Sequence, residues 1–211
     1  MRPLTDTTPK PLLPVLGRPM IEWHLLALAQ AGIREVVINT AWLEEQFPAT
    51  LGDGARFGLS LSYSHEGRDW GEALETAGGI TTALEALCAG GREAFWVVSG
   101  DIWAPDFRFD AARAEHFLAS GLDAQLWLVP NPPYHPDGDF EIAPGERQTY
   151  ANLALMRPTL LAGLARGKRA ALGPLLRDGV RAGRIGLSRY EGRWENVGTP
   201  AQWAALQTPA A

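Results

Sequence analysis

The sequence predicts an α/β fold with a mostly parallel sheet and helices on both faces. Short apolar runs rich in β-branched and aromatic residues, at 36–38 and 95–98, are typical of strands that are buried on both faces. A helical pattern at 76–87 lies between them. Because strands and helices alternate along the chain, we expect parallel strands joined by helical connections.

The remaining elements follow from the same patterns. Apolar residues recur at helical spacing from Met20 to Ala31, and Gly32 then ends the helix. Pro200 stands where a closing helix would begin. Further helices are expected at 43–51, 107–119, 160–164 and 172–182, strands at 59–63 and 124–129, an antiparallel pair at 140–142 and 150–155, and a hairpin of 185–190 with 193–194.

Composition limits the possible functions. The 211 residues are expected to form a single domain, 1–211, with one continuous core. The 19 basic and 24 acidic side chains give a net charge of -5, which argues against a nucleic-acid partner. Cys88 is the only cysteine, and no apolar run reaches the roughly 18 residues that span a bilayer. We therefore expect a cytoplasmic protein without a membrane segment; its oligomeric state is not predicted.

A lysine near the start of the chain lies between prolines. Pro9, Pro11 and Pro14 fix φ and disfavour a helix, so Lys10 is expected on a stiff, extended loop. Such a loop can aim an ammonium group at a phosphate. Proline-rich segments are also common as solvated linkers, and proline content alone leaves that alternative open.

An aspartate follows one of the predicted strands. Asp101 comes after 95–98 through Ser99-Gly100, and ligands of parallel sheets bind at the carboxyl ends of the strands. Mg²⁺ prefers oxygen ligands, usually one or two carboxylates together with substrate phosphates. Asp101 is therefore a candidate metal ligand. The structural alternative is an Asx-turn or a helix cap.

The order of these residues resembles the sugar-1-phosphate nucleotidyltransferases. Leu4-Thr5, then Pro9-Lys10-Pro11-Leu12-Leu13-Pro14-Val15 and Gly17-Arg18-Pro19-Met20-Ile21, is similar to the signature of that family. Segments 37–42, 52–58 and 75–79 favour the short bacterial uridylyltransferases that act on N-acetylmuramate 1-phosphate. The resemblance implies a Rossmann-like fold and transfer of a nucleotidyl group from UTP to a sugar-1-phosphate, with release of pyrophosphate, in cell-wall sugar recycling.

The resemblance also implies residue roles. Lys10 would be catalytic, and Asp101 and Asn196 would bind Mg²⁺. The family has an aspartate where this chain has Asn196, whose amide brings no charge, so Glu195 is an alternative ligand. The implied nucleotide-binding residues are Glu75, Thr76, Ala77, Gly78 and Gly79, and the implied sugar-binding residues are Asp139, Glu141, Asn152 and Lys168.

Some of these assignments have structural alternatives. A bare Gly78-Gly79 pair is more often a hinge, and Lys168, between Gly167 and Arg169, is more often a solvated surface charge. In the family, a strand and a glycine-rich loop ending in arginine precede the matching residues. We therefore expect this chain to be truncated at its N-terminus relative to the family, which would leave open edges on neighbouring strands. A nucleotide-sugar-binding or regulatory protein without catalysis, and a thymidylyl- or guanylyltransferase, are the alternative interpretations.

Overall fold

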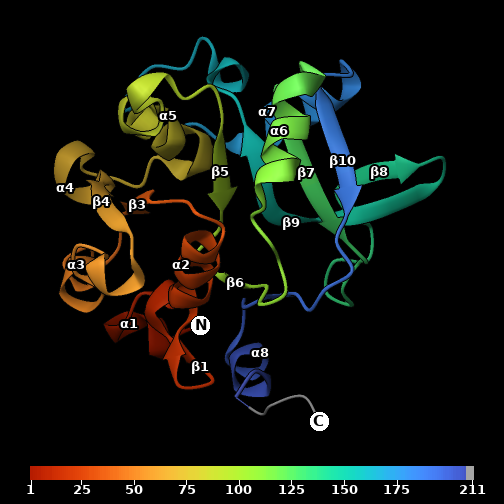
Figure 1. Cartoon of the computed structure of the whole chain (residues 1–211). Coiled ribbons are helices and arrows are strands. Elements are labelled where there is room, and N and C mark those ends of the chain that lie inside the picture. Colours follow the sequence, from red (N-terminus) through yellow and green to blue (C-terminus); the bar gives the residue numbers. More distant parts are fainter. Residues whose placement is uncertain (208–211) are drawn as a thin grey trace. The chain divides into compact units, whose positions relative to one another are not determined.

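The computed structural model describes residues 1–207 (Figure 1). These residues form two compact units. The first unit comprises 1–73, 99–108 and the chain from Gly192, and the second comprises 74–98 and 109–191. Both contain helices and strands, as the predicted α/β class requires. None of the helices within 1–207 has the length and apolar character needed to cross a bilayer.

The first unit contains two parallel strands, β3 (Glu35–Thr40) and β4 (Ser60–His65). The preceding helix, α2 (Met20–Gln30), packs its apolar face against this pair. Shorter helices are α3 (Gln46–Leu51), η2 (Ala55–Phe57) and α4 (Glu66–Trp70). The core of this region is apolar and consists of Leu12, Ile21, Leu25, Ile38, Phe47, Leu51, Phe57, Leu59 and Leu61.

The beginning of the chain is more helical than its prolines predict. It forms α1 (Leu4–Thr7) and a 3₁₀ turn, η1 (Lys10–Leu12), so the expectation of a fully extended loop around Lys10 is wrong. Proline is compatible with the first turn of a helix, where its missing N–H has no partner to lose, and Pro11 occupies that place. A short hairpin of β1 (Pro14–Val15) and β2 (Arg18–Pro19) then leads into α2.

The end of the chain also belongs to the first unit. Strand β11 (Glu195–Asn196) pairs antiparallel with β6 (Ile102–Trp103). Helix α8 (Pro200–Ala205) begins at Pro200 as predicted, and the Thr199 hydroxyl caps it by accepting from the Gln202 amide. The Trp203 indole donates to the Pro14 carbonyl at 2.8 Å, which attaches α8 to the opening hairpin.

The second unit is built on a sheet in the order β10-β7-β9-β5, with β8 added on β9. Its strands are β5 (Phe95–Val98), β7 (Ala124–Val129), β8 (Phe140–Ala143), β9 (Glu146–Met156) and β10 (Ile185–Arg189). β9 runs antiparallel to both β5 and β7, and β10 is parallel to β7. β5, β7 and β10 therefore share one direction, as expected for a mostly parallel sheet. The predicted antiparallel return of 140–142 is confirmed, because β8 runs antiparallel to β9, but its partners are 146–148 at the start of β9. Residues 150–155 of β9 pair instead with β7 and β5.

Three helices and two 3₁₀ turns accompany this sheet. They are α5 (Glu75–Leu87), η3 (Ala89–Gly91), α6 (Ala111–Ser120), η4 (Pro158–Leu161) and α7 (Leu172–Arg181). The prediction that a helix begins at Phe107 is wrong, because the Asp110 carboxylate accepts from the Arg113 amide and caps α6 four residues later. The predicted helix at 160–164 is only the turn η4.

The predicted hairpin around Glu191-Gly192 is wrong. β10 pairs with β7, and the Tyr190 amide continues that pairing by donating to the Leu128 carbonyl at 2.7 Å. After Gly192 the chain enters the first unit. There the Arg193 guanidinium and amide donate to the Asp106 carboxylate, at 2.7–3.1 Å, and β11 begins. This ion pair between residues distant in sequence directs the chain into β11, and no local turn signal reveals it.

β3 and β5 are among the strands that have one edge uncovered by any strand within 1–207. β3 pairs only with β4, and β5 pairs only with β9. The remaining edge of each strand carries backbone groups that could pair with a further strand. The expected strand upstream of Met1, and the expected single domain, stay predictions.

The Asp106–Arg193 pair predicts a pH-dependent contribution to stability. Its hydrogen bonds lower the pKa of Asp106 from 3.8 to about 2. Because the pKa of Asp106 is lower in the folded state, the ionised carboxylate stabilises the fold at any pH above its ordinary pKa of 3.8. This contribution is lost as the pH falls from about 4 to about 2. Asp106→Asn is therefore expected to cost about 0.5–1 kcal/mol at pH 7, because the pair is partly exposed.

Urea unfolding of the parent and of Asp106→Asn at pH 7, 5 and 3 measures this contribution. Asp178→Asn serves as the control, because Asp178 also pairs with an arginine, Arg181, but is more exposed than Asp106. It should change stability by less than about 0.5 kcal/mol. A difference between Asp106→Asn and the parent that stays constant down to pH 3 would contradict the assignment.

Candidate active site

Two predicted site residues that are far apart in sequence meet in the first unit. Lys10, at the start of η1, donates from Nζ to Oδ2 of Asp101 at 2.9 Å. About a third of each side chain is exposed, 27% for Lys10 and 33% for Asp101. The proposed catalytic cation and the proposed metal ligand are thus neighbours on a surface that a ligand can reach.

A glycine makes this meeting possible. A Cβ atom on Gly100 would lie 3.0 Å and 3.1 Å from Cγ and Cβ of Pro11. Any larger residue at position 100 would therefore push away the turn that carries Lys10. The other carboxylate oxygen of Asp101 accepts from the Ser99 hydroxyl at 2.9 Å. Both oxygens of Asp101 thus have donors, and its orientation is defined.

The second predicted metal ligand lies beside the first in the backbone pairing. Asn196 in β11 is opposite Ile102, the residue after Asp101, and the Val197 amide donates to the Asp101 carbonyl at 3.1 Å. The alternative ligand, Glu195, accepts from the Gln202 side chain at 2.9 Å. Glu195 is thus tied to α8, and the choice between Asn196 and Glu195 as the second ligand stays a prediction. Within 1–207, no three His, Cys, Asp or Glu side chains gather as a metal site.

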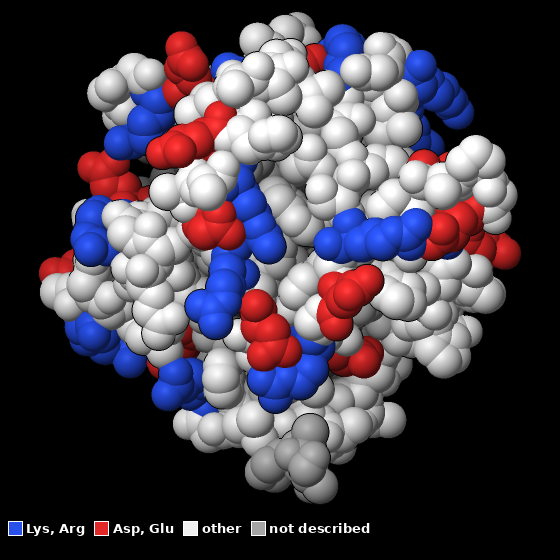
Figure 2. Space-filling view, turned by 45° about the vertical axis from the view of Figure 1, so that its right-hand side comes forward, with Lys and Arg blue, Asp and Glu red and all other residues white. Residues whose placement is uncertain are grey.

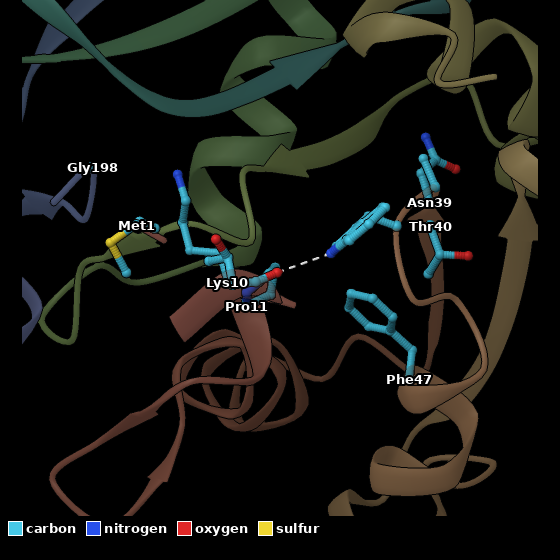
Figure 3. Close-up of a pocket in the computed structure, with 10 residues that line it drawn as sticks. Met1, Lys10, Pro11, Asn39, Thr40, Phe47 and Gly198 are labelled. Atoms are coloured by element: carbon cyan, nitrogen blue, oxygen red, sulfur yellow. Dashed lines mark hydrogen bonds between the residues drawn. The ribbon is translucent and has the colours of Figure 1, made fainter. Parts of the chain in front are cut away.

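A pocket of about 470 Å³ opens beside Lys10 in the first unit. Figure 3 shows Lys10 and Pro11 on one side of it and Asn39, Thr40 and Phe47 on the other. Asn39 and Thr40 end β3, so the pocket lies at the carboxyl end of a parallel strand, as ligand sites on such sheets do.

Trp42 also lines this pocket, and the residue is 59% exposed. The indole N–H donates to the Thr5 carbonyl at 3.0 Å, which ties the loop after β3 to α1. Sequence reasoning assigned no role to Asn39, Thr40 or Trp42. The available signal was that strand 36–38 ends in polar residues at the edge where ligands bind.

The predicted nucleotide-binding residues begin α5 in the second unit. Glu75 and Thr76 are exposed, whereas Ala77, Gly78 and Gly79 are buried. Glu75 has a positive φ of 58°, which is uncommon for a residue with a side chain and is often associated with functional sites. Its carboxylate accepts from Nε and Nη2 of Arg169, at 2.8 and 2.7 Å.

The segment that carries Lys168 packs against this helix start. The Gly78 amide donates to the Ala170 carbonyl at 3.1 Å, and the Ala170 amide donates to the Leu74 carbonyl at 2.9 Å. A Cβ on Gly78 would lie 2.4 Å from the Lys168 carbonyl oxygen. Because Gly78 has no side chain, the backbone of Lys168 and Ala170 can pack directly against it. The predicted nucleotide-binding turn and Lys168 belong to one packed arrangement.

Two of the predicted sugar-binding residues are tied within the second unit. The Asp139 carboxylate accepts from the Tyr150 amide at 2.8 Å and lies 3.2 Å from Nε2 of His135. Glu141 accepts from the Gly145 amide at 2.8 Å and so closes the turn between β8 and β9. In the structure these carboxylates hold loops in place, and a sugar-binding role for either stays a prediction.

Asn152 is the sugar-binding candidate with the clearest geometric signal. It has a φ of 58° and lies where the pairing of β9 with β7 shifts register, between the partners of Leu126 and Leu128. Val98 pairs with Leu153, so Asn152 lies just beyond the carboxyl end of β5. Bulges of this kind redirect side chains and are frequent beside active sites. A sugar-binding role for Asn152 stays a prediction.

The predicted site residues divide between the two units. Lys10, Asp101 and Asn196 are in the first, and the nucleotide-binding and sugar-binding candidates are in the second. On the face shown in Figure 2, basic and acidic side chains are interspersed. Many charged side chains of the described residues form ion pairs, such as Arg189 with Glu146. The cation that faces the pocket beside β3 is Lys10.

A pocket at the carboxyl end of parallel strands is where nucleotide-binding α/β proteins hold their ligands. In this chain a paired lysine and aspartate lie beside such a pocket. The model of the family described as "Nucleotidyl transferase" matches residues 1–133. The chain is 44% identical, over all of its length and 93% of the relative, to an N-acetylmuramate alpha-1-phosphate uridylyltransferase of Neisseria meningitidis. It is 39% identical over 40% of its length to a UTP--glucose-1-phosphate uridylyltransferase of Synechocystis, of which 23% is covered.

Solved structures agree on the fold. A Bacillus anthracis protein described as a glucose-1-phosphate thymidylyltransferase, in complex with sucrose, superimposes with a TM-score of 0.79. The match covers 98% of this chain and 88% of that one at 20% identity. HddC of Yersinia pseudotuberculosis, complexed with GMP-PN, gives a TM-score of 0.69 at 15% identity, with 95% and 89% of the two chains covered. The chain belongs to the nucleotidyl transferase family, which confirms the resemblance found in the sequence.

The packing of Gly78 predicts a selective effect of a single methyl group. Gly78→Ala is expected to destabilise the fold by about 1–3 kcal/mol, because the new Cβ would meet the Lys168 backbone, which cannot move like a flexible side chain. Urea unfolding measures this loss of stability.

Gly173→Ala in α7 is the matched control. A Cβ there would meet only the end of the Arg177 side chain, at 3.2 Å, and alanine is preferred to glycine in a helix by up to about 1 kcal/mol. Its stability should stay the same or rise. Equal losses in both variants would show that the contact with Lys168 is unimportant.

Proposed function

We propose that this protein transfers a uridylyl group from UTP to a sugar-1-phosphate and releases pyrophosphate, with N-acetylmuramate 1-phosphate as the acceptor. The observation that carries the proposal is the 44% identity, over the whole chain, to the Neisseria meningitidis uridylyltransferase of that specificity. A role in the recycling of cell-wall sugars in the cytoplasm follows from that activity.

The reaction requires positioning and charge stabilisation. An oxygen of the sugar-1-phosphate attacks the α-phosphorus of UTP, a new P–O bond forms, and the bond to pyrophosphate breaks. Negative charge develops on the phosphoryl oxygens, so a fixed cation close to them lowers the barrier. Lys10 is such a cation, because η1 and the packing of Pro11 on Gly100 limit where its backbone can lie.

The side chains at Asp101 and Asn196 suit a divalent cation of the kind that the family generally uses, and we propose Mg²⁺. Mg²⁺ is commonly bound through one or two carboxylates plus substrate phosphates, and Asp101 supplies one partly exposed carboxylate. Asn196 would add a neutral amide oxygen. When bound, the cation would offset charge on the nucleotide phosphates.

The same carboxylate oxygen cannot hold an ammonium group and a metal ion equally well. Oδ2 of Asp101 is occupied by the ammonium group of Lys10 in the structure. A partly exposed pair of this kind contributes only about 0.2–1 kcal/mol, so a ligand can separate it at low cost. We propose that Lys10 leaves Asp101 for the phosphates when nucleotide and metal bind.

Substrate preference is the direct test of the proposed function. Pyrophosphate release is measured with UTP, dTTP and GTP, each with the 1-phosphates of N-acetylmuramate, N-acetylglucosamine, glucose and mannose. UTP with N-acetylmuramate 1-phosphate should give a kcat/KM at least about tenfold above any other pair, since selective pockets discriminate by about 10–200-fold.

Asp101→Asn is the control for that panel, because it removes one charge and changes the shape little. It should abolish metal-dependent turnover and keep the circular dichroism spectrum of the parent. A preference for dTTP with glucose 1-phosphate, or full activity of Asp101→Asn, would overturn the assignment of substrate or of metal ligand, respectively.

Lys10→Ala separates the catalytic from the structural role of the opening segment. It should lower kcat about a hundredfold, or by about 3 kcal/mol in the barrier, with little change in KM for either substrate. Without nucleotide, it should bind Mn²⁺ about two- to fivefold more tightly, because Asp101 loses its competing cation.

Arg166→Gln also removes one positive charge, at an exposed position paired with Glu85, and should leave kcat and Mn²⁺ affinity at parent values. If Lys10→Ala behaved like Arg166→Gln, Lys10 would have no part in catalysis, and the opening segment would have only a structural role.

A further inference from the structure

A buried histidine forms a hydrogen bond with Ile102, the residue that follows the proposed metal ligand Asp101. His24, in the middle of α2, is 2% exposed, and its Nε2 lies 2.8 Å from the carbonyl oxygen of Ile102. A carbonyl oxygen can only accept a hydrogen bond, so Nε2 carries the proton. Burial lowers the pKa of His24, which keeps the ring neutral with Nδ1 unprotonated.

The carbonyl group that His24 binds has no other way to be satisfied within its strand pair. β6 is only two residues long and pairs with β11 on one side. Successive carbonyls of an extended chain point in opposite directions, so the Asp101 carbonyl faces the Val197 amide and the Ile102 carbonyl faces α2. Ile102 is completely buried. Without His24, a buried acceptor would be left unpaired.

The backbone at Asp101 is thus held from two sides. The Val197 amide holds it on the β11 side, and the imidazole of His24 holds it on the α2 side. α2 is also connected to Lys10 through the short segment formed by η1, β1 and β2. α2 is therefore connected both to the turn that carries Lys10 and to the strand that follows Asp101.

We propose that His24 is a positioning residue, which aims the Asp101 carboxylate at the site of the cation by donating a hydrogen bond to the Ile102 carbonyl. The proposal rests on the proposed function for its consequence in catalysis, but its geometry does not depend on the substrate. The residue contacts neither metal nor nucleotide and acts only through the backbone of β6.

Three variants test the proposal. His24→Leu removes the donor, whereas His24→Gln places an amide N–H where the imidazole N–H lies. Leu25→Val, at a buried position of the same helix, removes one methylene group and leaves the hydrogen bond intact. Should His24→Leu fail to fold, His24→Met, whose flexible side chain fills irregular space, replaces it.

Two measurements are made on each variant and on Asp101→Asn. Hydrogen exchange of the Val197 amide reports on the Asp101 backbone without any ligand, and Mn²⁺ binding in the presence of UTP reports on the carboxylate. His24→Leu should lower the protection of Val197 by about tenfold, since opening of a local unit costs less when one of its hydrogen bonds is missing. It should weaken Mn²⁺ binding by at least about fivefold, as expected for a residue that orients a ligand.

His24→Gln should restore both values to within about twofold of the parent. Leu25→Val should lower the melting temperature and change neither value. If His24→Leu changed neither the exchange of the Val197 amide nor Mn²⁺ binding, the proposal would be overturned. It would also be overturned if Leu25→Val, with a melting temperature equal to that of His24→Leu, showed the same loss of protection and of Mn²⁺ affinity. If Asp101→Asn left Mn²⁺ binding unchanged while Val197 protection still responded to His24, the metal assignment would fail, and only the part of the proposal in which His24 holds the backbone at Asp101 would stand.

Discussion

The contact between Lys10 and Asp101 depends on close packing of the backbone at their two segments. A 3₁₀ turn carries the lysine, a glycine removes the side chain that would keep this turn away, and the serine before that glycine orients the carboxylate. The pair is partly exposed, so it is weak by itself. Its value lies in geometry, because the packing holds two groups of opposite charge beside the pocket that Lys10 lines.

The second unit uses a different physical device. Its candidate residues lie at positions where the backbone is strained, since Glu75 and Asn152 both have positive φ. The surrounding contacts maintain that strain, through Arg169 for Glu75 and through the register shift of β9 for Asn152. Other carboxylates nearby, those of Asp139 and Glu141, are used to fix loops.

Local sequence signals predicted most elements but few of the contacts between distant segments. The strands 95–98 and 124–129 have the bounds expected from their apolar runs, and α5 and α7 lie within a residue of theirs. No pattern in the sequence relates positions 91 residues apart, so only the family resemblance indicates that Lys10 and Asp101 are close together. The hairpin at 185–194 was predicted wrongly for the same reason, since the partner of Arg193 is Asp106. No sequence signal distinguishes His24 from other histidines on amphipathic helices, because its hydrogen-bond partner is the carbonyl of Ile102, which is distant in sequence.

A crystal structure with Mn²⁺ and a non-hydrolysable UTP analogue would test the central claim, that Lys10 and Asp101 form the phosphate and metal end of the active site. Anomalous scattering locates the manganese without assumptions about the ligands. The account predicts an anomalous peak at a carboxylate oxygen of Asp101, with the Lys10 ammonium moved from Oδ2 to a phosphate oxygen of the analogue. A manganese peak elsewhere, with Lys10 still paired to Asp101, would contradict it.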